Sequence, residues 1–396
     1  MSARLKRGRV LGPALVAIGL LLAALALSAC GGGDDTTSGA TESAGATESE
    51  SSGGGGSETA SAGGGEAWCG EDGVTLGIQD GGGLNAWSKE SLKQVQLEAA
   101  KCPAVEKEIV VNAGFEPQKA VSGLQSMVAQ GANAIVIIPD SGVCAEVPAM
   151  RQATQHGAAV VAWAADPCGT EGTDWNKYVD WDTVAAGREW AEWVIEQMGG
   201  KGQLLYEGGP AGNTVSSNTA KGVLEVVEEN PGVELVEPIS EEQWPVTNWD
   251  PAEAKKLTAS LIAKHPEIDG MVNDYGATAQ AAIQAFQAAG KKVPPTASTE
   301  ANALACTWKE AKDKGEEFQL LTISSRNWLG RYAVQQAVAE ASGGEPPALK
   351  GNGVFSLGIW EDSAGGQEPK CDEAASPEAY FSNEMPEAEM NKIALE

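Results

Sequence analysis

The chain has 396 residues and a formal net charge of −28, from 55 acidic and 27 basic side chains. This charge would repel the phosphates of nucleic acids, so nucleic acid is not an expected partner. The acidic balance is instead typical of a secreted domain that must stay soluble. With only two histidines, His156 and His265, triads and His-rich metal sites are hard to build. Neither the dinucleotide fingerprint nor the phosphate-binding loop occurs, so we expect no enzyme, cofactor or metal.

The first thirty residues predict an export signal. Four basic residues precede an unbroken run of apolar and small residues over positions 10–27. A run of this length could almost span a bilayer, which leaves a retained transmembrane helix as the alternative. However, Leu27-Ser28-Ala29-Cys30 resembles the lipobox of bacterial lipoproteins, in which cleavage before the cysteine leaves a thiol that carries diacylglycerol. We therefore expect residues 1–29 to be removed, and lipidated Cys30 to anchor an extracytoplasmic protein to the cell membrane.

A tether is expected next, over residues 30–66. After Cys30 the stretch is almost entirely Gly, Ser, Thr, Ala, Glu and Asp, so it cannot bury enough apolar surface to offset the entropy of ordering. Such a composition is typical of a flexible linker. The folded part then begins near Trp68 and has about 330 residues, more than one hydrophobic core usually supports. Two lobes are therefore expected.

From Val74 onward, short apolar runs alternate with longer amphipathic segments. Most of the runs lack strict alternation and several are rich in Val and Ile, which is typical of strands buried on both faces of a parallel sheet. The predicted strands are 74–78, 108–112, 134–138, 159–163, 203–206, 233–236, 270–273 and 318–323, with a weaker one near Thr296.

The segments between these runs predict helices with apolar stripes at i, i+3 and i+4 spacing. The stripes are Val121, Leu124 and Val128; Val184, Gly187, Ala191, Val194, Ile195 and Met198; and Leu257, Leu261 and Ile262. Asp182 stands where the N-cap of the second helix is expected, and Gly199-Gly200 should end it. His156 and His265 are expected to be C-terminal caps. Repeated strand–helix units predict right-handed βαβ connections and an α/β fold with doubly wound, Rossmann-like parallel sheets.

This pattern runs twice along the chain. The first series ends at residues 163–167 and a second begins near Lys201. We therefore expect an N-terminal lobe over 67–166 plus 326–350 and a C-terminal lobe over 167–325 plus 351–396, joined by a three-crossover hinge. Ligands bind beyond the carboxyl ends of strands in open parallel sheets, so the two sets of strand ends should face each other across a cleft.

The remaining six cysteines indicate disulfides, since an even number in an exported chain is typical of them. Several pairings are possible. Order along the fold favours Cys69–Cys102, Cys144–Cys168 and Cys306–Cys371. The clustered Cys and His residues that a zinc site needs are missing from the sequence.

Four segments carry a family resemblance. The first joins residues 76–78 to Asn85-Ala86-Trp87, the second is QGANAIVIIP at 130–139, and the third is GAAVV at 157–161. The fourth begins with HPEIDGMVND at 265–274 and continues to Gly290. In order and spacing they resemble the type I periplasmic binding proteins of the ribose- and galactose-binding class, from about Val74 to Gly344. The resemblance implies a monomeric protein that binds a small solute, a sugar by preference, for the permease of an ABC-type importer.

The resemblance also implies which loops contact the ligand. Asn85 and Trp87 occupy the first loop, where the family places a polar group and a ring that stacks on the ligand. Asp140 and Asp166 follow the third and fourth strands, and Asp274 matches the family's ligand-binding aspartate. Further candidates at strand ends and at the second crossover are Asn213, Ser217, Glu300, Asn302, Ser325 and Asn327, beside the rings of Trp163 and Trp328.

Each of these positions has a structural alternative. The three aspartates could cap helices, and Trp87 could pack in the core. The family's ligand-binding arginine would fall at Ser217, so a ribose-like specificity does not follow; Arg326, at the second crossover, could take its place.

Two other functions stay open. A sensing lipoprotein that docks on a chemoreceptor or sensor kinase would have the same sequence features, and a lipid-anchored hydrolase could use paired carboxylates. The acidic tail, residues 365–396, has Cys371 as its only obvious tether, and a helix over 384–396 could pack on a lobe.

Overall fold

The computed structural model describes residues 66–393, apart from residues 81, 84, 143 and 384. The expected signal, the lipidation site at Cys30 and almost all of the tether lie outside the described residues. Within the described part, no helix combines the length and the apolar character that crossing a bilayer requires.

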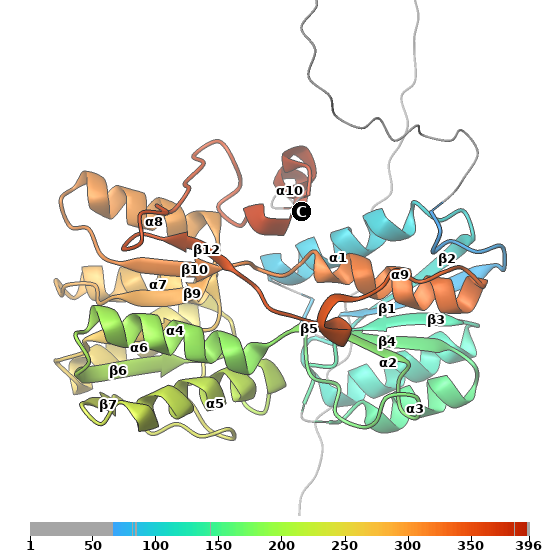
Figure 1. Ribbon diagram of the computed structural model, residues 1–396, viewed down its shortest axis with the longest axis horizontal. Coiled ribbons are helices and arrows are strands. Elements are labelled where there is room, and N and C mark those ends of the chain that lie inside the picture. The colour runs from blue at the N-terminus through green and yellow to red at the C-terminus, as the bar shows by residue number, and fades with distance from the viewer. Residues whose placement is uncertain (1–65, 81, 84, 143, 384, 394–396) are drawn as a thin grey trace, which may run out of the picture. The chain divides into compact units, whose positions relative to one another are not determined.

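The first lobe is built on a six-stranded sheet in the order β11-β5-β4-β3-β1-β2, in which every pairing is parallel. Helices α1 and α9 lie on one face, and α2 and α3 on the other (Figure 1). The elements are β1 (Val74–Asp80), α1 (Ala86–Ala99), β2 (Val105–Asn112), α2 (Pro117–Ala129), β3 (Ala134–Ile137), α3 (Val147–Gln155), β4 (Ala159–Trp163), β5 (Lys177–Trp181), α9 (Leu329–Ser342) and β11 (Val354–Phe355).

The second lobe has the same plan. Its sheet has the order β12-β10-β9-β8-β6-β7, and only the β10–β12 pair is antiparallel. Helices α4 and α5 pack together on one face, and α6 to α8 cover the other (Figure 1). The elements are α4 (Thr183–Gln197), β6 (Gly202–Glu207), α5 (Thr214–Glu229), β7 (Val233–Leu235), α6 (Pro251–Lys264), β8 (Gly270–Asn273), α7 (Gly276–Ala288), β9 (Thr296–Thr299), α8 (Asn302–Asp313), β10 (Leu320–Ile323) and β12 (Ile359–Asp362), followed by a tail with α10 (Glu387–Ile393). The predicted α/β fold with two doubly wound parallel sheets is confirmed.

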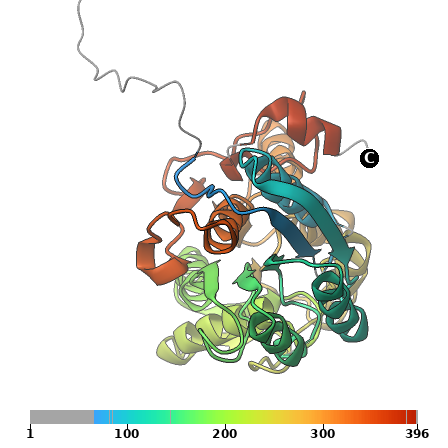
Figure 2. The ribbon, with the colours of Figure 1, turned by 90° about the vertical axis from the view of Figure 1, so that its right-hand side faces the viewer.

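Three passages of the chain join the lobes. They lie between β5 and α4, between β10 and α9, and between β11 and β12. The second falls near Ser325, where the sequence placed it. The first differs from the expected boundary at residue 166, because β5 pairs with β4 and the chain leaves the first sheet only after Trp181. The third follows Phe355 rather than residue 350, because β11 pairs with β5. In Figure 2, the orange ribbon of α9 lies among the blue and green elements of the first lobe.

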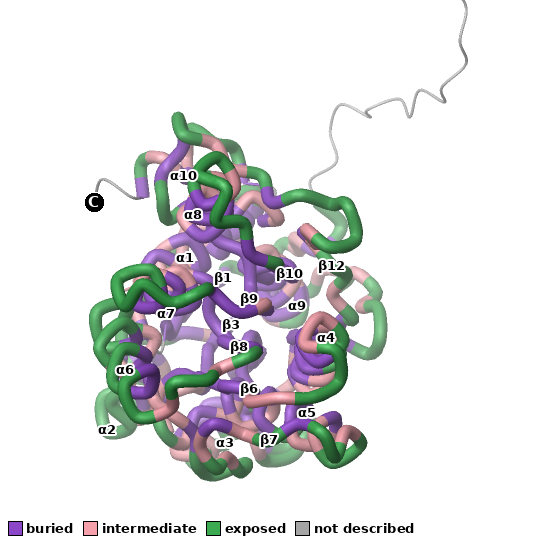
Figure 3. Tube along the Cα trace, turned by 90° about the vertical axis from the view of Figure 1, so that its left-hand side faces the viewer, coloured by how far each residue is buried: buried purple, intermediate pink, exposed green. Residues whose placement is uncertain are grey.

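The central strands of both sheets are buried, whereas the edge strand β2 is largely exposed. The outer faces of the helices are exposed, as the green segments of Figure 3 show. Local chemistry sets the helix ends. Asp182 accepts a hydrogen bond from Ala185 N and caps α4, and Gly199 and Gly200 follow its end with φ of 75°. His156 and His265 are the C-caps of α3 and α6, as predicted.

Three disulfides join the pairs that the sequence favoured. Cys69–Cys102 and Cys144–Cys168 lie within the first lobe, and Cys306–Cys371 ties α8 to the tail. Groups of three or more side chains suited to a metal ion do not occur among the described residues.

Candidate ligand cleft

A cleft of about 430 Å³ lies where the carboxyl ends of the two sets of strands meet. This volume counts all space between the atoms, including space open to solvent. Residues from both lobes and from the second crossover line it: Asn85, Trp87, Ser88, Phe115, Ile138, Asp140 and Ala164 from the first lobe, Val215, Trp249, Asp274 and Tyr275 from the second, and Arg326 from the crossover.

Asp274, which follows β8, is held in place by several donors. Its Oδ2 accepts hydrogen bonds from Ser216 Oγ at 2.5 Å and from Gly209 N at 3.3 Å, and its Oδ1 accepts one from Trp249 Nε1 at 2.8 Å. Burial raises the pKa of Asp274, while these hydrogen bonds and the charge of Arg326 oppose the rise. The carboxylate is therefore fixed in orientation before any ligand arrives.

The ring of Trp249 packs directly on the backbone of Gly209. A Cβ at position 209 would lie 2.2 Å from this ring, so only glycine fits there. Trp249 reaches across the cleft to Phe115 of the first lobe, with the ring centroids 5.7 Å apart. The two rings thus form an aromatic wall to which each lobe contributes one side chain.

Arg326 is the one cation among the residues that line the cleft. Its guanidinium lies between two indole rings, 5.0 Å from the centroid of Trp87 and 4.6 Å from that of Trp181. The side chain is 93% buried, and in the described part of the chain its Nε has no hydrogen-bond acceptor and the side chain forms no ion pair. Burial lowers the pKa of Arg326, and the nearby charge of Asp180 opposes this. A buried guanidinium without an acceptor can bind an oxygen atom of a ligand.

The carboxyl groups of Asp180, Asp274 and Asp140 act on the charge of this arginine. Burial, with the charges of Asp80 and Glu146, raises the pKa of Asp140 well above its usual range. The Oδ1 of Asp140 is buried and has no hydrogen-bond donor among the described residues. Burial likewise raises the pKa of Asp80 and of Asp180 to about 6. The cleft therefore offers both a cation and carboxyl oxygens that are not fully satisfied by the protein.

Backbone strain gathers at the same place. Four cleft residues other than glycine have left-handed φ values: Phe115 at 59°, Ala164 at 60°, Trp249 at 52° and Arg326 at 61°. Such conformations are costly for residues with a Cβ and are often kept at functional sites. The strain supports a functional cleft.

Four of the predicted ligand residues lie along the cleft: Asn85, Trp87, Asp140 and Asp274. Asn85 also caps α1 by accepting a hydrogen bond from Ser88 N. Three more, Asn213, Asp166 and Ser217, are not among the residues that line the cleft. Asn213 caps α5 and donates a hydrogen bond to Asp140 O at 3.3 Å, and Thr214 donates one to Asp166 O at 3.4 Å. The Asp166 side chain accepts a hydrogen bond from Cys168 N, and the Ser217 hydroxyl donates a hydrogen bond to Glu241 O.

The remaining candidates lie at the second crossover and beneath the tail. Ser325 O accepts a hydrogen bond from Trp87 Nε1, and Asn327 donates hydrogen bonds to Trp87 O and Ser91 Oγ. These contacts fix the first loop against the crossover. The side chains of Glu300 and Asn302 bond to the tail and are not among the residues that line the cleft. Trp163 stacks on Trp87 at 5.9 Å, and Trp328 packs on Phe355.

Sequence reasoning missed Phe115, Trp249 and Tyr275. Phe115 follows Asn112-Ala113-Gly114 at the end of a strand, and Trp249 precedes the Asp250-Pro251 start of α6. An aromatic residue at the end of a strand or just before a helix start is a signal that could have found both.

The fold defines this protein as a two-lobed, type I solute-binding protein. Residues 82–345 match the family described as periplasmic binding protein domain, and the chain belongs to that family. It is 27% identical over 175 residues to the xylitol-binding protein of Mycolicibacterium smegmatis, and this match covers 44% of this chain and 47% of the relative. It is 26% identical over 212 residues to the D-xylose-binding periplasmic protein of Escherichia coli, and this match covers 52% of this chain and 60% of the relative. The matches thus span about half the length of these relatives.

Solved structures show the same fold. An ABC transporter solute-binding protein from Bacillus halodurans with bound myo-inositol has a TM-score of 0.61 and 18% identity, and covers 73% of this chain and 94% of its own. The periplasmic component of the arabinose ABC transporter from Shewanella sp. ANA-3, bound to L-arabinofuranose, also has a TM-score of 0.61 and 18% identity, with 72% and 92% covered.

Proposed function

We propose that this protein captures a small polyhydroxylated molecule, a sugar or a sugar alcohol, in the cleft between its lobes and delivers it to an ABC-type importer. The observation that carries the proposal is the pairing of an acceptor and a donor in one buried cleft. The fixed carboxyl group of Asp274 can accept hydrogen bonds from ligand hydroxyls, and the unpaired guanidinium of Arg326 can donate them.

The aromatic side chains suit the same ligand class. Sugars and polyols present C–H faces between their hydroxyls, and the indole ring of Trp87 can cover such a face without needing a hydrogen bond. Phe115 and Trp249 can cover another. Because carboxyl groups and a guanidinium lie close together, a neutral ligand that both accepts and donates hydrogen bonds fits better than an ion. The xylitol- and xylose-binding relatives support this choice.

Binding would close the lobes. Open and closed forms interconvert through the three crossovers, and a ligand that touches both lobes shifts the population toward the closed form. In the closed form, Asn213 bonds to Asp140 O and Thr214 to Asp166 O, from one lobe to the other. These contacts, with the Phe115–Trp249 wall, would seal the cleft.

The cellular setting is part of the proposal. A lipid on Cys30 would hold the protein outside the cytoplasmic membrane, and residues 31–66 would let the domain reach a permease. The protein would act as a monomer and would not transform its ligand. The sensing alternative has less support from the curated relatives, which are a xylitol-binding and a D-xylose-binding protein, although one similar solved structure is the fructose-binding periplasmic domain of a hybrid two-component system.

Calorimetric titration of the full chain tests the function. We expect xylitol, D-xylose, myo-inositol or L-arabinose to bind and to raise the melting temperature, since a ligand of the folded state stabilises it. Asp274→Ala and Trp87→Ala should each weaken binding by about 1–3 kcal/mol, from unpaired groups and lost stacking. Binding of amino acids and no polyhydroxylated compound would refute the ligand class. Turnover of a glycoside would favour the hydrolase instead.

A further inference from the structure

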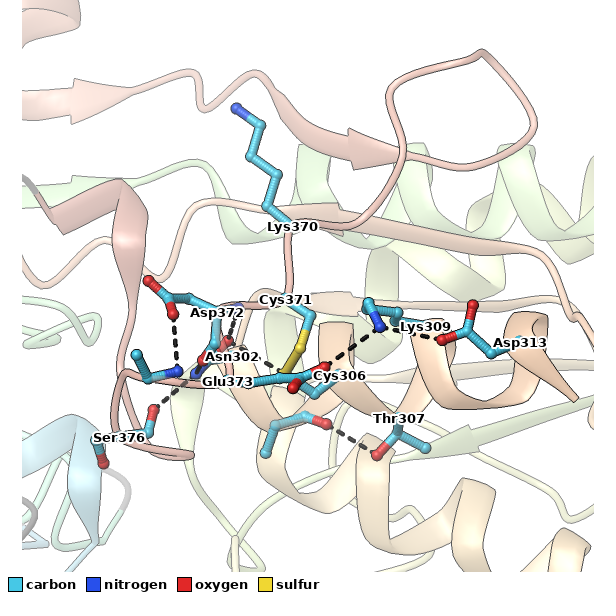
Figure 4. The surroundings of a disulfide bond; sticks show 12 residues. Asn302, Cys306, Thr307, Lys309, Asp313, Lys370, Cys371, Asp372, Glu373 and Ser376 are labelled. Atoms are coloured by element: carbon cyan, nitrogen blue, oxygen red, sulfur yellow. Dashed lines mark hydrogen bonds and ion pairs between the residues drawn. A yellow bond between two sulfur atoms is a disulfide. The ribbon is translucent and has the colours of Figure 1, made fainter.

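The tail after β12 is anchored first on the second lobe. Cys371 forms a disulfide with Cys306 of α8, and Asn302 Nδ2 donates hydrogen bonds to Asp372 O and Ser376 O, each at 2.9 Å (Figure 4). Asn302 N and Ala303 N at the start of α8 donate to backbone carbonyls of the tail. Since α8 has no side-chain N-cap, the tail satisfies N–H groups that the helix leaves unpaired.

The tail then runs beside the second crossover. Ser382 N donates hydrogen bonds to both carboxyl oxygens of Glu300, at 2.9 and 3.2 Å, and the hydroxyls of Ser382 and Ser324 lie 2.7 Å apart. The hydroxyls of Tyr380 and Tyr275 lie 2.9 Å apart. All of these partners belong to the second lobe or to the crossover itself.

The next residue, Asn383, is bonded to the first lobe. It is fully buried and its side chain donates a hydrogen bond to Glu90 of α1. Its backbone carbonyl accepts hydrogen bonds from Gln94 Nε2 at 2.9 Å and from Arg331 Nη2, on α9, at 2.7 Å.

Helix α10 extends this attachment along α1. Met390 and Ile393 belong to a small apolar cluster against which Leu97 packs, and Lys93 pairs with Glu389 at 3.5 Å. The tail therefore holds the first lobe by buried hydrogen bonds, an apolar contact and an ion pair.

Ser382 and Asn383, which are adjacent in the chain, thus form hydrogen bonds to different lobes. Consecutive Cα atoms are fixed about 3.8 Å apart, so Glu300 of one lobe and Glu90 of the other cannot separate while Ser382 and Asn383 keep their bonds. Breaking either set would remove hydrogen bonds from buried carboxyl groups: among the described residues Glu300 would keep only the donor Ser325 N, at 3.3 Å, and Glu90 would lose the amide of Asn383, which is costly.

We propose that residues 371–383 and 385–393 form a strap, a fourth connection between the lobes that limits how far they open when no ligand is bound. The strap adds to the three crossovers, and its residues are not among those that line the cleft with Asp274 and Arg326. By restricting the open form, it raises the fraction of molecules that are ready to bind. Its loss therefore lowers the apparent affinity, and if only a tenth of the molecules stay binding-competent, the apparent Kd rises about tenfold.

The test measures the distance between the lobes in the full chain. Spin labels on an unnatural amino acid at the exposed positions Gln155 of α3 and Lys256 of α6 report this distance by pulsed electron resonance. Two strap variants are compared with the parent: Asn383→Ala, and the double variant Cys306→Ser/Cys371→Ser. The matched control, Cys69→Ser/Cys102→Ser, removes a disulfide that lies within the first lobe only.

Without ligand, both strap variants should show a longer and broader distance distribution than the parent, and the control should match the parent. If one strap variant fails to fold, the other decides the matter. Distributions identical to that of the parent in the folded strap variants would overturn the proposal, and so would an equal change in the control. The measurement needs no ligand, so it decides about the strap even if the proposed sugar specificity fails.

Discussion

The cleft and the strap both join the two lobes, but they differ in how their polar groups are satisfied. Where the strap contacts the lobes, Asn383 of the strap and Glu300 of the second lobe have hydrogen-bond partners supplied by the protein. In the cleft, Arg326 Nε and Asp140 Oδ1 are buried without any partner among the described residues. Buried groups that lack partners are costly, and they are retained where a ligand completes them. The comparison separates polar residues that serve binding from polar residues that serve architecture.

Replacing Arg326 by Met gives the largest effect on binding that this comparison predicts. The variant loses hydrogen bonds from a charged donor to the ligand, which corresponds to about 2 kcal/mol, or roughly thirtyfold in Kd. The free energy of unfolding in urea should fall by no more than about 1–2 kcal/mol, because among the described residues the guanidinium forms no ion pair and the variant gives up only its contacts with the rings of Trp87 and Trp181. Calorimetric titration and urea unfolding measure the two quantities. A large loss of stability with unchanged affinity would mean that Arg326 is a structural residue.

Asn383→Ala acts on the strap and should lower stability. It removes the side-chain donor of the buried Glu90, so the free energy of unfolding should fall by about 1–2 kcal/mol. Thr214→Ala, which removes a contact at the exposed edge of the cleft, should change it by less than about 0.5 kcal/mol. Urea unfolding of both variants checks this, and equal losses would show that the strap is no stronger than the edge contact.

The strap should also make stability depend on pH. Burial, followed by the charge of Glu300, raises the pKa of Glu90 to about 9, and burial raises that of Glu300 to about 7. Each folded-state pKa lies above the unfolded value, so the stability that these groups contribute is complete below about pH 4.5. It is lost as the pH rises to about 9.

The ligand-free melting temperature should therefore fall between about pH 5 and pH 9, and the fall should be smaller in Glu90→Gln. Glu196→Gln, a change at an exposed position of α4, is the matched control. Parallel pH profiles for Glu90→Gln and the parent would rule out this role of Glu90.

Trp249→Phe should have the smallest of the predicted effects on ligand binding. The ring and its contact with Phe115 remain, but the hydrogen bond from Nε1 to Asp274 is lost, which weakens ligand binding by about 1 kcal/mol. Trp249→Ala removes the aromatic wall as well and should weaken binding further. Equal affinities of these two variants by calorimetry would show that the ring does not contact the ligand.

Most of the fold could be predicted, because the buried parallel strands are continuous apolar runs. Strand β5 was missed since its sequence, KYVDW, contains Lys177 and Asp180 and does not form such a run. Strand β11 has only two residues and leaves no pattern. Both strands form because they pair with distant segments of the chain. The observed lobe boundaries therefore differ from the predicted ones.

The site was predictable where a residue follows a strand directly, as at Asp140 and Asp274. Glu300 and Asn302 also follow a strand, yet the tail occupies them, and nothing local in the sequence indicates where a tail seventy or more residues away will pack. Arg326 was named only as a possible replacement for the family's arginine. Trp249 was missed because it reaches the cleft through left-handed backbone, which residue patterns do not predict outside glycine.

The Cys306–Cys371 bond has a practical consequence for anyone who prepares this protein. The bond forms in an oxidising compartment. Protein made in a reducing bacterial cytosol would therefore lack the covalent link between α8 and the carboxyl-terminal segment. Affinities measured on such preparations would describe a looser molecule than the exported one.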